Sequence, residues 1–254
     1  MITSSHSFVR KAGDFREHMR QWWEAQVICF HEKLHPYCFP QTDGEKLFWP
    51  IAGLNLLVFA AWRVPGLQPS MIKWFTSNPA SSATCLPMIL STFSHYSLVH
   101  LGCNMICLHS FMRPTVHELG KEQFLGVYLS AGVFSSLASM MYKVGSRKAG
   151  SHSLGASGAI MAVLGMFATI HPDSNLQIIL LPFFTFTAAT GLKALMTLDT
   201  LGLFFRWRMF DHAAHLAGAS LGVAWCYLGN PLVWGGLGGQ LVTAWHNAKE
   251  GRSK

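Results

Sequence analysis

The chain has 254 residues, of which half are apolar and only 12% are charged, and its mean hydropathy is +0.28. A soluble domain carries about 25% charged residues, so this composition excludes an ordinary soluble protein and predicts a polytopic membrane protein. The net charge of +7 comes from Lys and Arg that flank apolar segments, where they contact lipid headgroups. No basic stripe with interleaved aromatic residues indicates nucleic-acid binding.

The first 46 residues are predicted to form a segment outside the membrane. They contain His31, Glu32 and His35 in the order H-E-x-x-H, which is the zinc pattern of metalloproteases with Glu as general base. Pro36 follows at once, and a helix is disfavoured at the residue before a proline. No third ligand follows at a recognisable spacing, so we predict no metal site here.

Six apolar segments have a length compatible with membrane spans, which predicts an all-α membrane protein. In chain order they are Leu47–Trp62, Met88–Met112, Phe124–Tyr142, Leu154–Ile170, Leu176–Met196 and His212–Leu228. We therefore expect a six-helix core over residues 47–230 and a C-terminal tail, residues 231–254, that is amphipathic at most. No internal repeat is evident, which argues against a transporter built from duplicated halves.

The second segment carries His100 and Asn104, which are four residues apart and therefore share one helix face. Both side chains can donate hydrogen bonds to a developing oxyanion, and Asn is an established residue type for that role. The alternative interpretation is that the two residues are polar contacts between neighbouring helices.

The fourth segment begins near Gly155-Ala156-Ser157-Gly158. Small side chains around Ser157 allow another backbone to approach closely. Gly155 and Gly158 also permit an irregular backbone with free N–H groups beside the hydroxyl, which is what an oxyanion hole requires. Taken alone, Ser and Gly are also ordinary packing residues in membrane helices.

The sixth segment carries His215, with Gly218 and Gly222 three and seven residues later on the same helical face. Such a face can pack closely against the segment of Ser157, and a hydroxyl beside an imidazole makes a serine nucleophile with its general base. We expect Gly218→Leu to destroy this arrangement and Gly218→Ala to be milder.

Asp211 precedes His215 by four residues and has two interpretations. It could be the third member of a catalytic triad, or it could cap the helix, because Asp is a preferred residue at a helix N-terminus. We favour the cap, and therefore a dyad rather than a triad.

Together these motifs resemble the rhomboid family of intramembrane serine proteases. The marks of that family are H-x-x-x-N, G-x-S-G and A-H-x-x-G-x-x-x-G, and all three occur here in order on the expected segments. Phe93-Ser94-His95, Leu181–Ala188 and Phe210–His215 are similar to the mitochondrial branch. The resemblance covers roughly Leu47–Trp245. The additional membrane helix that usually precedes the core of that branch is not evident, and Val27–Lys46 has no recognisable counterpart.

The resemblance implies a six-helix bundle that acts as an intramembrane serine endopeptidase, in the mitochondrial inner membrane, on single-pass membrane proteins. Ser157 is then the nucleophile and His215 the general base, while His100, Asn104 and the backbone N–H of Ser157 form the oxyanion hole. Gly155, Gly158, Gly218 and Gly222 would serve helix packing near the dyad. No metal or organic cofactor is implied. The alternative is a catalytically inactive rhomboid-like protein that binds membrane helices, although such proteins typically lack the serine or the histidine.

Overall fold

The computed structural model describes residues 20, 42–178, 181–207 and 209–250. The chain divides into two units, Met1–Thr42 and Asp43–Lys254, and every helix and strand with defined bounds belongs to the second unit. The H-E-x-x-H pattern at residues 31–35 lies outside the described residues, so its interpretation stays a prediction from sequence.

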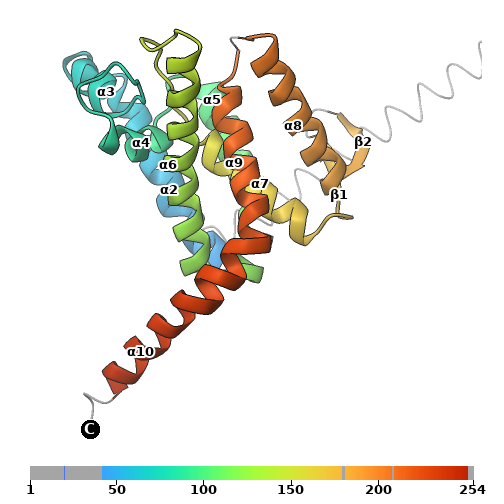
Figure 1. Ribbon diagram of the computed structural model, residues 1–254. Helices are drawn as coiled ribbons and strands as arrows, with labels where there is room; N and C mark the ends of the chain where they lie inside the picture. The colour runs from blue at the N-terminus through green and yellow to red at the C-terminus, as the bar shows by residue number, and fades with distance from the viewer. Residues whose placement is uncertain (1–19, 21–41, 179–180, 208, 251–254) are drawn as a thin grey trace, which may run out of the picture. The chain divides into compact units, whose positions relative to one another are not determined.

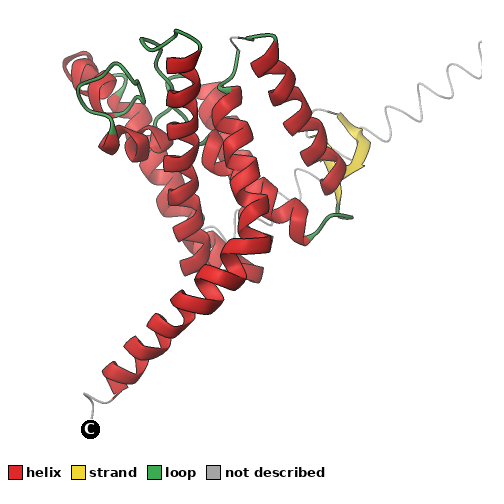
Figure 2. Cartoon of the chain, in the orientation of Figure 1, coloured by secondary structure: helices red, strands yellow, loops and turns green. Residues whose placement is uncertain are grey.

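The second unit is a bundle of helices with one small β-hairpin (Figures 1 and 2). Its α-helices are α2 (Asp43–Ala61), α3 (Gln68–Trp74), α4 (Cys85–Leu90), α5 (Leu98–Leu119), α6 (Lys121–Gly145), α7 (Ser157–Ile170), α8 (Ala188–Phe204), α9 (His212–Ala224) and α10 (Gly239–Glu250). The hairpin consists of β1 (Asn175–Ile178) and β2 (Leu181–Thr187). Two 3-10 turns, Pro65–Leu67 and Ser91–Phe93, and a π-helical segment, Trp225–Gly238, complete the described elements.

The centre of the bundle is α7, which packs against α5, α6, α8 and α9. Every residue of α7 from Gly158 to Ala168 is buried. A helix that is apolar on all sides is expected in the interior of a large or membrane-embedded protein. Large side chains fill the space around it, and Phe124, Tyr128, Leu108 and Met112 are completely buried. The first residue of this central helix is Ser157.

The contact between α7 and α9 is made by backbone rather than by side chains. A Cβ atom added at Gly218 would collide with the carbonyl oxygen of Gly158, and one added at Gly222 would collide with that of Ala162. Small residues are common where membrane helices approach closely, because dispersion contacts between backbones replace the hydrophobic effect. The two helices therefore lie as near to one another as their main chains allow.

The second apolar segment, Met88–Met112, is not a single helix as predicted. It comprises α4, a 3-10 turn and a short loop, and α5 begins only at Leu98. Ser97 before it has an extended backbone, with φ −101° and ψ 136°. The loop is also held by a side-chain bond, in which Trp62 Nε1 donates to Ser94 Oγ at 2.8 Å. These contacts are long-range, and hydropathy does not report them.

The fifth apolar segment, Leu176–Met196, is likewise wrong as a single helix. Its first part is the antiparallel hairpin, in which Asn175 pairs with Thr187. Phe and Thr are enriched in strands, and a short apolar run does not distinguish strand from helix by periodicity. Helix α8 starts at Ala188 because Thr187 Oγ1 accepts the N–H of Thr190 at 3.2 Å.

Two helices of the described residues are long and apolar enough to cross a membrane, namely α6 and the continuous helix His212–Trp245. The pair formed by α2 and Pro65–Trp74, bent by 99°, adds a third if it is one span. Helix α7 has 14 residues, or about 21 Å, against a hydrocarbon layer of about 30 Å. The protein is thus mostly helical and able to span a membrane, but the predicted count of six spans is not confirmed. The chain beyond residue 230 continues the helix that begins with α9, through the π-helical segment and α10, to Glu250.

The close contact at Gly218 changes our expectation for Gly218→Ala. A methyl group there meets a backbone oxygen, which cannot rotate away as a side chain would. We now expect Gly218→Ala to be nearly as damaging as Gly218→Leu and to destabilise the bundle by about 1–3 kcal/mol, the usual cost of overpacking. Thermal unfolding in detergent measures the effect.

The matched control is Gly126→Ala in α6, where an added Cβ meets no atom within 4 Å. This variant should be as stable as the wild type or slightly more stable, because Ala is a better helix former than Gly. Equal stability of the two alanine variants would show that α7 and α9 are farther apart than the structure places them.

Candidate active site

Ser157 begins α7, and the residues before it form an irregular turn. Gly155 has a φ of +132°, which residues with a side chain rarely adopt. A Cβ at this position would lie 2.7 Å from Cε1 of His100. The N–H of Ala156 donates to Nε2 of His95 at 3.4 Å. The first N–H groups of an α-helix have no acceptor within the helix, so such donors lie beside the Ser157 hydroxyl.

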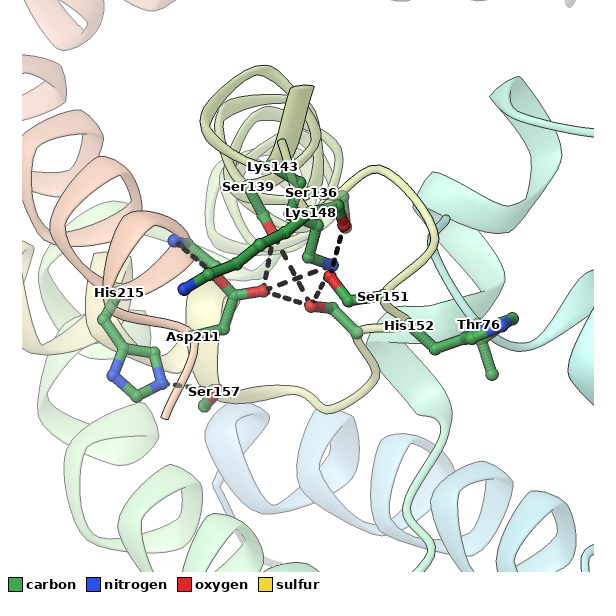
Figure 3. Close-up of polar contacts among 12 residues, drawn as sticks. Thr76, Ser136, Ser139, Lys143, Lys148, Ser151, His152, Ser157, Asp211 and His215 are labelled. Atoms are coloured by element: carbon green, nitrogen blue, oxygen red, sulfur yellow. Dashed lines mark hydrogen bonds and ion pairs between the residues drawn. The ribbon is translucent and has the colours of Figure 1, made fainter. Parts of the chain in front are cut away.

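His215 lies in the first turns of α9 and points at Ser157 (Figure 3). Its Nε2 atom is 2.9 Å from Ser157 Oγ, which is hydrogen-bond distance. Helix α9 begins where it does because Asp211 caps it, and the Asp211 carboxylate accepts the N–H of Ala214 at 3.2 Å. The cap favoured from the sequence is therefore present, and the structure brings the predicted nucleophile and base together.

His100 and Asn104 lie one turn apart on α5. The His100 ring packs against Gly155, two residues before the nucleophile, and its centroid is 4.9 Å from that of His95. Asn104 is 6% exposed, and its Nδ2 donates to the carbonyl of His100 at 2.9 Å. An amide nitrogen carries two donors, so one N–H of Asn104 is engaged in its own helix and the other is left for a further acceptor.

Gly158 permits close approach on two sides of the nucleophile. A Cβ atom there would overlap the side chain of Ser135 on α6. On the other side, its carbonyl oxygen receives Gly218 of α9. The four glycines singled out in the sequence thus lie at three contacts, those of the Ser157 turn with α5 and of α7 with α6 and α9.

Comparison with known proteins agrees with this geometry. Residues 83–231 match the Rhomboid domain. The chain is 46% identical, over 240 residues, to the mitochondrial presenilin-associated rhomboid-like protein of Homo sapiens, and 45% identical to its counterpart in Mus musculus. Each match covers 94% of this chain and 59% of the relative. The chain belongs to the rhomboid family.

The chain also belongs to the mitochondrial branch of this family, because its relatives are named as mitochondrial rhomboid proteins. Mitochondrial rhomboid protein 1 of Saccharomyces cerevisiae is 32% identical over 193 residues, which is 76% of this chain and 56% of that protein. The chain spans about three fifths of the length of these relatives. Because the human match covers 94% of the chain, it extends beyond Leu47–Trp245, the range over which the sequence resemblance was recognised.

One residue near the Ser157–His215 pair was not predicted from the sequence. Asp199 on α8 is 6% exposed, and its Oδ1 lies 2.7 Å from Nδ1 of His212 and 3.4 Å from Nδ1 of His215. The shorter contact is with His212, whose ring fills the space that a side chain at Gly202 would need. A carboxylate beside Nδ1 keeps the proton there, leaving Nε2 as the acceptor toward a serine, and stabilises the imidazolium that forms.

A signal for Asp199 was present in the sequence. It is an acidic residue within the apolar run from Ala194 to Phe205, and ionisable residues in membrane segments are functional candidates by default. The predicted fifth span ends at Met196, three residues before Asp199. The structure shifts that helix toward the C-terminus, to Ala188–Phe204, and thereby places the carboxylate inside it.

We expect Asp199→Asn to lower kcat by about 10- to 100-fold with little change in KM. The effect should be smaller than in soluble triads, where the corresponding change costs about 10,000-fold, because Asp199 is bonded more closely to His212 than to His215. Kinetics with a single-pass reporter protein in liposomes provide both constants.

The control is Asp173→Asn, the same change at an exposed residue after α7, which should leave both constants within about twofold of the wild type. A kcat for Asp199→Asn equal to that of this control would show that Asp199 has no role in the reaction.

Proposed function

We propose that this rhomboid-family protein is an intramembrane serine endopeptidase that cleaves single-pass membrane proteins within or near their transmembrane helix. The observation that carries the proposal is the 2.9 Å separation of Ser157 Oγ and His215 Nε2 at the start of two closely packed helices. Rhomboid proteins include intramembrane serine proteases, and a nucleophile within hydrogen-bond reach of its base is the signature of covalent catalysis.

In the proposed reaction, His215 Nε2 accepts the proton of Ser157 as Oγ attacks the carbonyl carbon of a substrate peptide bond. The protonated imidazole then donates that proton to the leaving nitrogen, the C–N bond breaks, and an acyl-enzyme remains. Water loses a proton to His215 while it attacks the ester, and the proton returns to Ser157 as the acid product leaves. Asp199, whose Oδ1 lies 3.4 Å from Nδ1 of His215, stabilises the imidazolium that forms in this cycle.

The oxyanion of each tetrahedral intermediate is proposed to be bound by His100, Asn104 and the backbone N–H of Ser157. His100 is in contact with the Gly155 turn, and Asn104 is one helical turn from His100. Donors fixed before the reaction stabilise the developing charge without reorganisation, which is why they contribute strongly to catalysis. Burial of Asn104 supports this role, because a buried amide is shielded from competing water.

Substrates are proposed to be membrane proteins whose helix unwinds easily near one end. An intact helix satisfies its own backbone groups in lipid, so its peptide bonds are inaccessible until it unwinds. The names of the relatives place them in mitochondria, and we propose the inner membrane as the location of this chain. The bilayer is then its second partner, and no metal or organic cofactor takes part in the proposed steps.

Ser157→Ala and His215→Ala should each lower the rate of reporter cleavage by at least about 1000-fold. The double variant should lose no more than either single variant, because residues that act as one unit are not additive. A fluorophosphonate probe should label the wild type on Ser157 and fail to label Ser157→Ala. Cleavage and labelling are both measured on protein reconstituted in liposomes.

The controls are Ser151→Ala and His117→Ala, both at exposed positions, which should keep wild-type activity. Wild-type protein that neither labels nor cleaves, yet binds single-pass helices, would support the inactive rhomboid-like alternative. Cleavage by Ser157→Ala at the wild-type rate would show that Ser157 is not the nucleophile and that the proposed dyad is wrong.

Asn104→Ala should lower kcat by about 10- to 100-fold and leave KM nearly unchanged, the pattern of an interaction made mainly in the transition state. One donor in a soluble enzyme contributes about 100- to 1000-fold, and here His100 and the backbone share the oxyanion. The matched control is Asn55→Ala in α2, because Asn55 makes the same type of bond, to the carbonyl four residues earlier. A fall in kcat of the same size in both variants would assign Asn104 to helix packing.

A further inference from the structure

Lys143, near the end of α6, is a buried cation that the proposed reaction does not use. Its side chain is 9% exposed. An ammonium group removed from water is costly unless it is paired and hydrogen-bonded. The Lys143 Nζ donates to Ser153 Oγ and lies 3.9 Å from Asp211 Oδ2. A buried charge in this position therefore has defined partners, both on segments that lead into the candidate active site.

The Asp211 carboxylate has more partners than a helix cap requires (Figure 3). Its Oδ1 accepts the N–H of Ala214 and completes the cap of α9. Its Oδ2 accepts two further hydrogen bonds, one from Ser139 Oγ on α6 at 2.5 Å and one from Ser153 Oγ. The second oxygen thus connects α9 to α6 and to the segment before α7.

The spacing of these contacts along the chain is the key observation. Ser153 precedes Ser157 by four residues, and Asp211 precedes His215 by four residues. Ser153 is also fixed by its backbone, because it exchanges two N–H to carbonyl hydrogen bonds of 2.8 and 2.9 Å with Ser77. The Ser153–Asp211 bond therefore joins the entries of the two helices that carry the dyad, one short segment away from each member.

We propose that Asp211 and Lys143 are positioning residues for the Ser157–His215 dyad. Their ion pair, bridged by Ser153, holds the start of α9 against the segment leading into α7 and thereby sets the distance between nucleophile and base. The proposal rests on the proposed proteolytic function. It assigns the second carboxylate oxygen of Asp211 a role in catalytic geometry, in addition to the cap made by the first.

The decisive variant is Asp211→Asn, because Asn is as good a helix cap as Asp but carries no charge for Lys143. We expect kcat and the rate of fluorophosphonate labelling to fall together by about tenfold or more, with KM changed less than about twofold. Misplacement of reacting groups by about 1 Å is sufficient for a loss of this order. Both rates are measured at a temperature at which thermal unfolding shows every variant to be fully folded.

Asp43→Asn is the matched control, since Asp43 lies in the first turn of α2 and pairs with Lys46 at 3.2 Å in an exposed position. It should keep wild-type kcat and labelling. Lys143→Met combined with Asp211→Asn should lose no more activity than Asp211→Asn alone, because the two groups act as one unit. The proposal would be overturned by a double variant that loses clearly more activity than Asp211→Asn alone. It would also be overturned by a labelling rate for Asp211→Asn within twofold of the control.

Ser153→Ala tests the bridge if Asp211→Asn does not fold. It removes one hydroxyl and leaves the backbone bonds to Ser77 in place, so we expect a loss in kcat and labelling rate of about three- to tenfold. Ser151→Ala, two residues away with an exposed hydroxyl bonded to the Lys148 carbonyl, should lose nothing. Equal rates for these two serine variants would contradict the positioning role.

The outcome for wild type separates this inference from the proposed function. Wild-type protein that cleaves and labels, together with positioning variants that match their controls, rejects the positioning role and leaves the protease. Wild-type protein that does neither rejects the protease, and the positioning role with it.

Discussion

The approach of α7 to α9 is the constraint on which the rest of this structure depends. Each helix presents glycine to the main chain of the other, and the contact is reciprocal, because a Cβ at Gly165 of α7 would lie 2.6 Å from the Ala219 carbonyl of α9. Ser157 and His215 lie at the start of these helices, so the backbone contact limits how far apart the two side chains can lie. Side chains in a loose interface can adopt several rotamers, whereas two touching main chains define one distance. The proposed proton transfer from Ser157 to His215 requires such a fixed distance.

The polar residues around the dyad follow a second rule, which is that buried charge must be partnered. Asp199, Asp211 and Lys143 are each in contact with groups of complementary charge or hydrogen-bonding capacity. In a bundle with so few charges, these contacts lie at the ends of α6, α8 and α9, near the start of α7. Apolar packing thus brings the helices together, and the polar contacts select the register at which they meet.

The features that depend on the spacing of nearby residues could be predicted from the sequence. The Ser157 turn, the Gly face of His215 and the cap at Asp211 are all patterns within a few residues, and the structure contains each of them. The sequence did not predict the hairpin Asn175–Thr187 or the break before Leu98, because those depend on pairing and on contacts with distant residues. Asp199 was missed for a related reason. The predicted fifth span ended before Asp199, and hydropathy defines such boundaries poorly.

The continuous helix His212–Trp245 has a consequence for the topology of the dyad. Its 34 residues measure at most about 51 Å, the length of a regular α-helix of that size, and even at a tilt of about 40° this length exceeds the thickness of the hydrocarbon layer. A helix of this length that crosses the layer places its two ends in opposite aqueous compartments. Since His215 belongs to the first turns, the face of the membrane at which Trp245 emerges would identify the other face as the one nearer to Ser157 and His215. Locating the C-terminal end of this helix would therefore report the orientation of the candidate site in the membrane.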